Sequence, residues 1–135
     1  MGAWSHEPFG NDTANDWAYE LEETTDCSLL ESAFDAVLEE DDYIDSDVAS
    51  EAIAAAEVVA KVLGRGTQND AYTEKVDAWL SANRVDINAD LRKKAKLALN
   101  RILGENSELC ELWEESEEGA LWKVSVQKLI SAVGV

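Results

Sequence analysis

The chain has 135 residues, with 29 Asp and Glu against 11 Lys and Arg, and its formal net charge is −18. A field of this sign repels nucleic-acid phosphates and acidic membrane surfaces and attracts basic surfaces, which argues against the first two as partners. A hydrophobic content of 46% excludes a disordered acidic tail, because the apolar residues suffice to offset chain entropy. The length predicts a single domain over residues 1–135.

The acidic residues are concentrated in the first sixty positions, which carry seventeen Asp and Glu and no Lys or Arg. Residues 61–135 carry the other twelve acids and all 11 basic residues, so this part is close to neutral. Acidity that adapts a protein to a salty habitat would spread over the whole surface. The one-sided charge therefore favours a role in binding a basic partner.

The sequence gives no sign of membrane insertion or export. No apolar run approaches the roughly 20 residues that a membrane span requires. The N-terminal residues lack the basic and hydrophobic regions of a secretory signal, which predicts a cytoplasmic protein. Cys27 and Cys110 are far apart in the sequence and are expected to be buried free thiols.

Helical patterns begin after an irregular lead segment, residues 1–11, which contains Pro8 and Gly10. A first helix is expected from about Thr13, because Ala14, Trp17, Ala18 and Leu21 recur on one helical face. The pattern Ser28-Leu-Leu-Glu31 matches a capping box and predicts the start of a second helix, with Leu30, Ala33, Phe34, Val37 and Leu38 inward.

An acidic connector over residues 39–47 separates the second helix from a third, which is expected from about Asp47 to Leu63 and to stop at Gly64. The third helix is apolar nearly all round, which is typical of a helix in the centre of a domain. The connector is expected to be a solvated acidic loop that caps this helix.

Four further helices are expected in the second half of the chain. A shorter helix over about 70–82 would bury Tyr72, Val76, Trp79 and Leu80, and another would open at Asn88 and end at Gly104. Helices over about 107–115 and after Gly119 complete the set. No run alternates with period two, so the prediction is an all-α domain of six or seven short helices in an irregular bundle.

The lead segment has two interpretations. Trp4 and Phe9 could fill the helical core while Asn11 or Asp12 caps the first helix. Alternatively, His6, Asp12 and Asp16 could form a small pocket around Trp4 and Trp17, with a carboxylate orienting the only histidine.

The same segment carries a family resemblance. Gly2, Trp4, Phe9, Asn11, Asp12, Asp16 and Trp17 follow the pattern G-x-W-x-x-x-x-F-x-N-D-x-x-x-D-W. This opening resembles that of a bacterial family of uncharacterised proteins, domain-of-unknown-function family 4259. The resemblance implies a small, acidic, helical, single-domain protein, and it supplies no activity.

No metal or cofactor site is predicted. Counted as a calcium loop from Asp45, the connector has Ser50 where glycine is needed and Ala56 where glutamate is needed. Zinc-ligand spacing and a phosphate-binding glycine loop are also absent from the sequence.

These features predict a non-enzymatic binding protein that engages a basic protein, as an immunity protein or antitoxin engages a nuclease toxin. The acidic outer faces of the first two helices and the connector are the expected interface, carried by Glu20, Glu23, Glu31, Asp35, Glu39, Glu40, Asp41, Asp42, Tyr43 and Asp45. The basic stretch of Arg84, Arg92, Lys93, Lys94 and Lys96 is expected to neutralise acidic residues, internally or across a dimer. The alternative is a metal-dependent or His6-assisted enzyme built on the lead segment.

Overall fold

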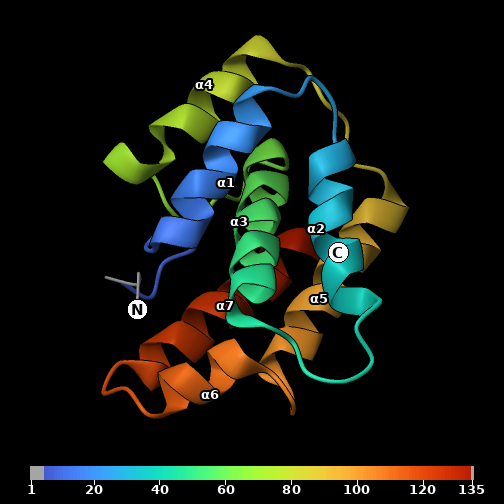
Figure 1. Ribbon diagram of the computed structural model, residues 1–135. Helices are drawn as coiled ribbons and strands as arrows, with labels where there is room; N and C mark the ends of the chain where they lie inside the picture. Colours follow the sequence, from blue (N-terminus) through green and yellow to red (C-terminus); the bar gives the residue numbers. More distant parts are fainter. Residues whose placement is uncertain (1–4, 135) are drawn as a thin grey trace.

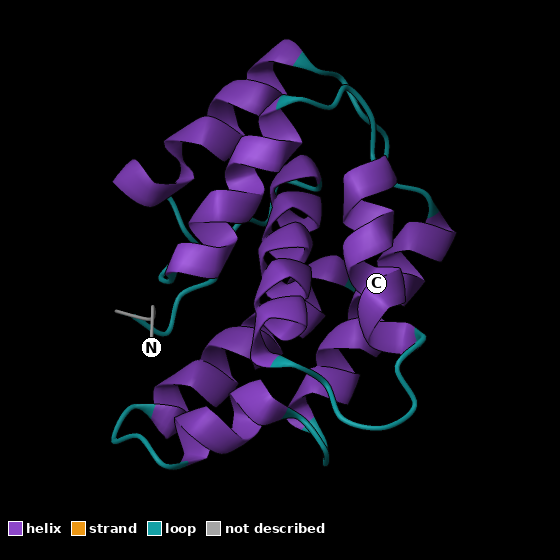
Figure 2. Cartoon of the chain, in the orientation of Figure 1, coloured by secondary structure: helices purple, strands orange, loops and turns teal. Residues whose placement is uncertain are grey.

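Seven α-helices and one short 3₁₀ helix make up the computed structural model, which describes residues 5–134 (Figures 1 and 2). In chain order they are α1 (Asp12–Glu22), α2 (Ser28–Leu38), α3 (Ser46–Val62), η1 (Ala71–Thr73), α4 (Glu74–Ala82), α5 (Ala89–Leu103), α6 (Glu108–Glu114) and α7 (Gly119–Val133). The described residues form no strand, and one isolated parallel bridge joins Ile44 to Ser107. The all-α prediction is therefore confirmed.

Helix α3 lies at the centre, as its composition predicted. All its residues from Ala52 to Ala60 are buried, and α1, α2, α5, α6 and α7 all pack against it. Figure 1 shows α1 and α2 on opposite sides of α3. The small side chains of Ala52, Ala54, Ala55 and Ala56, all 0% exposed, allow the neighbouring helices to approach closely.

Short polar side chains begin several of the helices. Asn11 accepts a hydrogen bond from Ala14 N (2.8 Å), Asp45 from Asp47 N (2.8 Å) and Asn88 from Leu91 N (2.8 Å). Each bond satisfies a backbone N–H that has no partner within its helix. The expected cap of α3 by the connector is confirmed in Asp45.

The capping box predicted at Ser28 is wrong. Cys27 occupies the N-cap position of α2, and Ser28 is already the first helical residue. The carboxylate of Asp26 accepts from both Ser28 N (3.0 Å) and Ser28 Oγ (2.6 Å). These two bonds lower the pKa of Asp26, because they favour its charged form.

A buried carboxylate in α3 joins three parts of the chain. Glu57, 0% exposed, accepts hydrogen bonds from Thr67 N (2.8 Å), Thr67 Oγ1 (2.6 Å) and Gln68 N (2.9 Å). Gln68 Oε1 in turn accepts from Phe9 N (2.8 Å). Burial raises the pKa of Glu57, while the bonds from Thr67 and Gln68 act in the opposite direction. This network fixes the loop after α3 and the lead segment onto the central helix.

Phe9 is fully buried, so it contributes to the core as one interpretation of the lead segment proposed. Its companion Trp4 lies outside the described residues. Tyr72 was expected in the core but is 49% exposed, because it lies in the 3₁₀ turn before α4 rather than on the inner face of a helix. The thiols of Cys27 and Cys110 are free, with Cys110 buried and Cys27 half-buried.

No helix among the described residues is both long enough and apolar enough to span a membrane.

Candidate functional site

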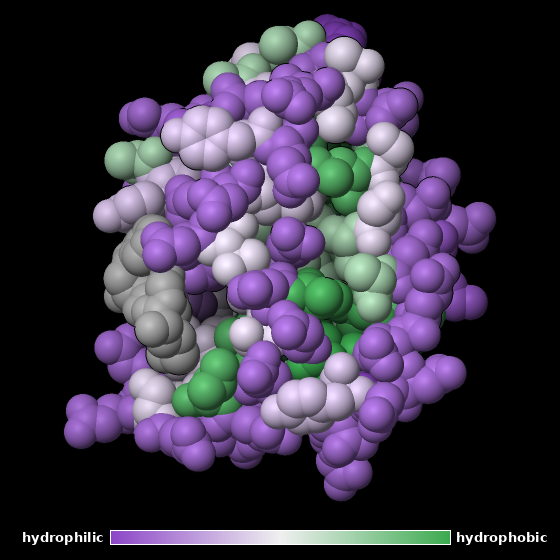
Figure 3. Space-filling view, in the orientation of Figure 1, coloured by the Kyte–Doolittle hydropathy of each residue, from purple (hydrophilic) through white to green (hydrophobic). Residues whose placement is uncertain are grey.

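The ten residues expected at the interface lie on the surface. Nine of them are exposed and Asp35 is half-buried. Glu20 belongs to α1 and Glu23 caps its C-terminal end, Glu31 and Asp35 lie on α2, and the remaining six lie in the connector between α2 and α3. Hydrophilic residues cover most of the surface over α1 and α2, with apolar side chains showing between them (Figure 3).

Two of these acids are neutralised within the chain. Lys94 Nζ on α5 lies 2.9 Å from Asp35 Oδ1 and 3.2 Å from Glu31 Oε2. The hydrogen bonds to Asp35 and then Glu31 raise the pKa of Lys94, because they favour its charged form. The neutralising role predicted for the basic stretch is therefore confirmed at Lys94, and Glu31 and Asp35 offer a partner less charge than their exposure suggests.

Three other carboxylates meet without a cation between α1 and α3. Burial raises the pKa of Glu51 on α3, and the nearby charges of Glu20 and Asp47 raise it further. Asp47 Oδ1 accepts a hydrogen bond from Thr13 Oγ1 (2.9 Å) on α1, which brings the starts of the two helices together. Glu20, Asp47 and Glu51 form no ion pair with any described residue.

We refer to these three residues, together with the connector carboxylates of Glu39, Glu40, Asp41, Asp42 and Asp45, as the acidic face. Asp45 links the two groups, because its carboxylate accepts from the backbone of Asp47. Asp47 and Glu51 are not among the ten residues predicted from the sequence, since the body of the third helix was expected to be buried; Asp47 was included only as the last residue of the connector. Their four-residue spacing at the start of that helix was the available signal, but the proximity of Glu20 depends on helix packing.

The connector is held in place by α5 and α6. Ile44 is fully buried and forms two backbone bonds, from its N–H to Asn106 O (2.9 Å) and from Glu108 N to its carbonyl (2.9 Å). Ser46 N donates to Glu108 Oε1 (2.8 Å), and Arg101 Nη2 donates to Asp42 O (3.1 Å). The carboxylates around Ile44 therefore project from a loop whose backbone is fixed at several points.

Tyr43, also expected at the interface, is 43% exposed, but its hydroxyl donates to Glu111 Oε1 (2.7 Å) on α6. This bond raises the pKa of Tyr43 to about 12, because the phenolate would be repelled by the carboxylate that accepts it. The hydroxyl contact helps to anchor the connector, and part of the Tyr43 side chain stays exposed.

The surroundings of His6 differ from the pocket that the alternative interpretation of the lead segment proposed. His6 Nδ1 lies 3.7 Å from Glu118 Oε1 at the start of α7, and it has no hydrogen-bond partner among the described residues. Asp12 and Asp16 are both exposed and form no bond with it, while Trp17 is buried in the core. The alternative grouping of His6 with Asp12 and Asp16 is therefore wrong, because α1, which begins at Asp12, exposes both carboxylates to solvent.

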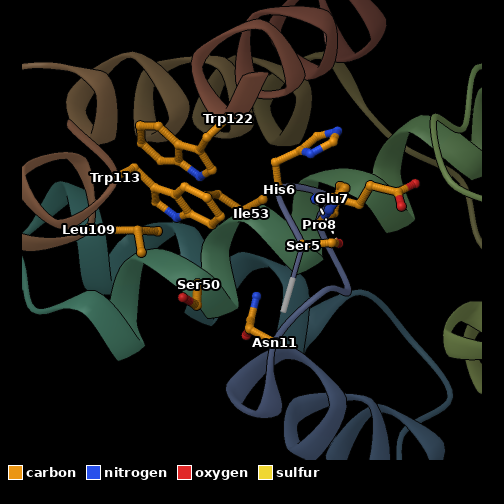
Figure 4. A pocket seen from close by; sticks show the side chains of 10 residues that line it. All are labelled: Ser5, His6, Glu7, Pro8, Asn11, Ser50, Ile53, Leu109, Trp113 and Trp122. Atoms are coloured by element: carbon orange, nitrogen blue, oxygen red, sulfur yellow. Dashed lines mark hydrogen bonds between the residues drawn. The ribbon is translucent and has the colours of Figure 1, made fainter. Parts of the chain in front are cut away.

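His6 lines a small cavity whose walls come from four parts of the chain (Figure 4). Trp113 and Trp122 stack along one side, with ring centroids 6.2 Å apart and planes 5° from parallel. The cavity volume is about 30 Å³, which accommodates about one or two water molecules and is too small for an organic substrate. A second cavity beside His6 has about 150 Å³ and is lined by His6, Glu7, Pro8, Thr67, Leu121, Val124, Ser125 and Lys128.

Within residues 5–134, no group of three or more His, Cys, Asp or Glu side chains is arranged to hold a metal ion.

Comparisons with known proteins identify the family of the chain. Neither the curated proteins nor the solved structures include a match to it. One family model, described as a domain of unknown function (DUF4259), matches residues 2–125, which include the opening pattern that resembled this family. Because the match covers most of the sequence, the chain belongs to the DUF4259 family.

Proposed function

We propose that this protein binds a basic protein partner through its acidic face and has no catalytic role of its own. The observation that carries the proposal is the proximity of Glu20, Asp47 and Glu51 between α1 and α3, where no cation among residues 5–134 pairs with them.

An unneutralised cluster of this kind costs folding free energy, because like charges at close range repel each other. Partial burial is the main cause of the raised pKa of Glu51, and the charges of Glu20 and Asp47 raise this pKa further. Lys or Arg side chains from a partner would relieve this repulsion. Relief of the repulsion between the carboxylates would then add a favourable term to the free energy of association.

The fixed connector favours the same role. Its carboxylates are attached to a backbone that Asn106, Glu108 and Arg101 hold in place, so little loop entropy is lost on binding. A net charge of −18 also accelerates encounter with a cationic surface at low salt.

The finer form of the proposal is an immunity protein or antitoxin that covers the cationic groove of a nuclease toxin. Enzymes that bind nucleic-acid phosphates carry concentrated Lys and Arg. Fixed carboxylates on a rigid helical domain can pair with those positive charges and exclude the nucleic-acid substrate from the groove.

The test is affinity capture from the source cell, identification of the captured protein, and measurement of the dissociation constant with both proteins purified. The proposal expects a basic partner whose affinity falls at least tenfold from low salt to physiological salt. Replacing Glu20 and Glu51 with Gln should weaken binding. The matched control replaces Glu115 and Glu117, two exposed acids before α7, with Gln. This control changes the net charge by the same amount.

A neutral or acidic partner, an affinity insensitive to salt, or an equal loss in both double variants would overturn the proposal. Inhibition of a captured nuclease, lost in the Glu20 and Glu51 variant, would support its finer form.

The alternative, an enzyme that depends on a metal or on His6, has one observation in its favour. His6 Nδ1 lies within 3.7 Å of Glu118 and has no described hydrogen-bond partner, so a carboxylate could orient the imidazole. Thermal-shift titrations with calcium, magnesium and zinc test it. The alternative fails if no ion shifts the melting temperature and a His6→Ala variant behaves normally in the cell.

A further inference from the structure

We propose a second binding site, for a phosphate group, in the surface cavity between the start of α5 and the end of α7. This site goes beyond the proposed partner binding and lies outside the acidic face. The cavity has a volume of about 270 Å³ and is lined by Ala89, Arg92, Lys93, Lys96, Val133 and Gly134.

The charge of this cavity is opposite to that of the molecule. Three of its six lining residues are cationic and none is acidic. Three other cavities among residues 5–134 are each lined by at least one Glu. Glu7 lines two of them, and three glutamates line the third, which lies beside Cys110. The cavity between α5 and α7 contrasts with these three, because all of its charged lining residues are positive in a chain with a net charge of −18.

Neither of the two lysine ammonium groups has a partner among residues 5–134. Lys93 and Lys96 are exposed, and their Nζ atoms form no hydrogen bond or ion pair there, although the chain has 29 acidic side chains. Lys94 lies between them in sequence but turns to α2, where it pairs with Asp35 and Glu31. That pairing occupies the carboxylates of α2 and leaves both ammonium groups available to a ligand.

Arg92 is held in position at the same cavity. Its Nε donates to Val133 O (2.9 Å), and Nη2 donates to Gly134 O. The other Nη has no described acceptor, and a guanidinium fixed in this way loses little entropy when it forms a further bond.

The lining selects the class of ligand. Two ammonium groups and one guanidinium favour a compact anion with several acceptor oxygens, which describes a phosphate group better than a single carboxylate. The volume leaves room beside it for a small organic body, and Ala89 and Val133 offer apolar surface to that body. Inorganic phosphate and small phosphomonoesters share this chemistry.

The test is a titration of the full isotope-labelled chain with inorganic phosphate at low ionic strength, followed by amide resonances in NMR. We expect saturable shifts centred on Ala89, Lys93 and Gly134, a dissociation constant of roughly 1 mM, and no such response to chloride at the same ionic strength. Phenyl phosphate should give shifts at the same amides. Tighter binding of phenyl phosphate would identify a phosphomonoester ligand, and equal binding would identify free phosphate.

A double variant, Lys93→Gln with Lys96→Gln, should weaken phosphate binding at least tenfold. Its matched control, Arg84→Gln with Lys128→Gln, removes two exposed cations whose side chains also have no partner in the described part of the chain, and it changes the net charge equally. The proposal is overturned by absence of saturable shifts, by shifts centred elsewhere, by an equal loss in the control, or by acetate binding as tightly as phosphate.

Discussion

At the scale of single residues, short polar side chains determine where several of the helices begin. Asn11, Asp45 and Asn88 begin helices because an acceptor side chain reaches an amide two or three residues ahead. Ser28 was misread because Asp26, an equally local competitor, takes its amide and hydroxyl. Glu57 could not be foreseen as a buried junction, because its donors come from a loop whose return path the helical pattern does not specify.

Glu57→Gln tests the junction. The amide retains one acceptor oxygen but places an NH₂ group where Thr67 and Gln68 present donors, so at least one donor loses its acceptor. We expect a loss of about 1–3 kcal/mol in the free energy of unfolding, measured by urea denaturation.

Thr67→Val provides the comparison, since it removes only the hydroxyl donor to Glu57 and keeps both backbone bonds. Its cost should be smaller, about 0.5–1.5 kcal/mol. Equal costs for the two variants, or an unchanged urea midpoint in Glu57→Gln, would show that the carboxylate does not hold the loop.

Asn11→Ala tests the start of α1. The change removes the acceptor for Ala14 N and should cost about 1 kcal/mol, again measured by urea denaturation. Asn11→Asp keeps an acceptor at the same place and should be close to neutral. A loss in Asn11→Asp as large as that in Asn11→Ala would mean that Asn11 acts through something other than this cap.

At the scale of elements, hydrophobic periodicity located the helices because each buries one face, and it identified α3 as central because nearly all of its faces are apolar. The acidic face was only partly predictable. The outer positions of α1 and α2 follow from periodicity, but the approach of Glu20 to Glu51 and of Lys94 to Asp35 depends on how helices pack. The connector was expected to be a solvated loop that caps α3; it does cap α3, but Ile44 also inserts into the core and pairs with the segment before α6.

Ile44→Ala tests the connector. The side chain is fully buried, so its truncation should lower the free energy of unfolding by about 2–4 kcal/mol through lost burial and a residual cavity. If the fixed connector presents carboxylates to a partner, the variant should also bind that partner more weakly at temperatures where it remains folded, because the loop must then be ordered on binding.

The matched control for Ile44→Ala is Leu129→Ala, which truncates another fully buried side chain on α7, away from the acidic face. It should lose stability to a similar extent and retain partner affinity. Weaker binding by both variants would trace the effect to stability, and unchanged binding by Ile44→Ala would contradict a role for the connector's fixed backbone.

At the scale of the whole molecule, the net charge of −18 acts against the compact state, because folding brings like charges together. Seven of the 11 basic side chains are engaged within the chain, by ion pairs, backbone carbonyls or the ring of Tyr19, yet most carboxylates keep no cationic partner. The free energy of unfolding is therefore expected to rise with ionic strength and with falling pH, more than it would in a protein with equal numbers of acidic and basic side chains.

Lowering the pH from neutral should stabilise the protein. The folded-state pKa values of Glu51 and Glu57 are raised above the ordinary value of 4.5, so the folded state binds protons more tightly than the unfolded state. The stability linked to these groups is fully present below pH 4.5 and is lost as the pH rises through their raised pKa values. Asp26, whose pKa is lowered, acts in the opposite sense only near and below its ordinary value of 3.8.

The expected outcome is a melting temperature that rises by an amount on the order of a few degrees between pH 7 and pH 5, measured by circular dichroism at low salt. Added sodium chloride at pH 7 should raise it as well, because screening weakens the same repulsion. The variant Glu51→Gln, Glu57→Gln should lose part of the pH response and keep most of the salt response, since the latter arises from the whole surface. A melting temperature that falls with either acid or salt would mean that attraction within the chain, and not repulsion across the acidic face, dominates its electrostatics.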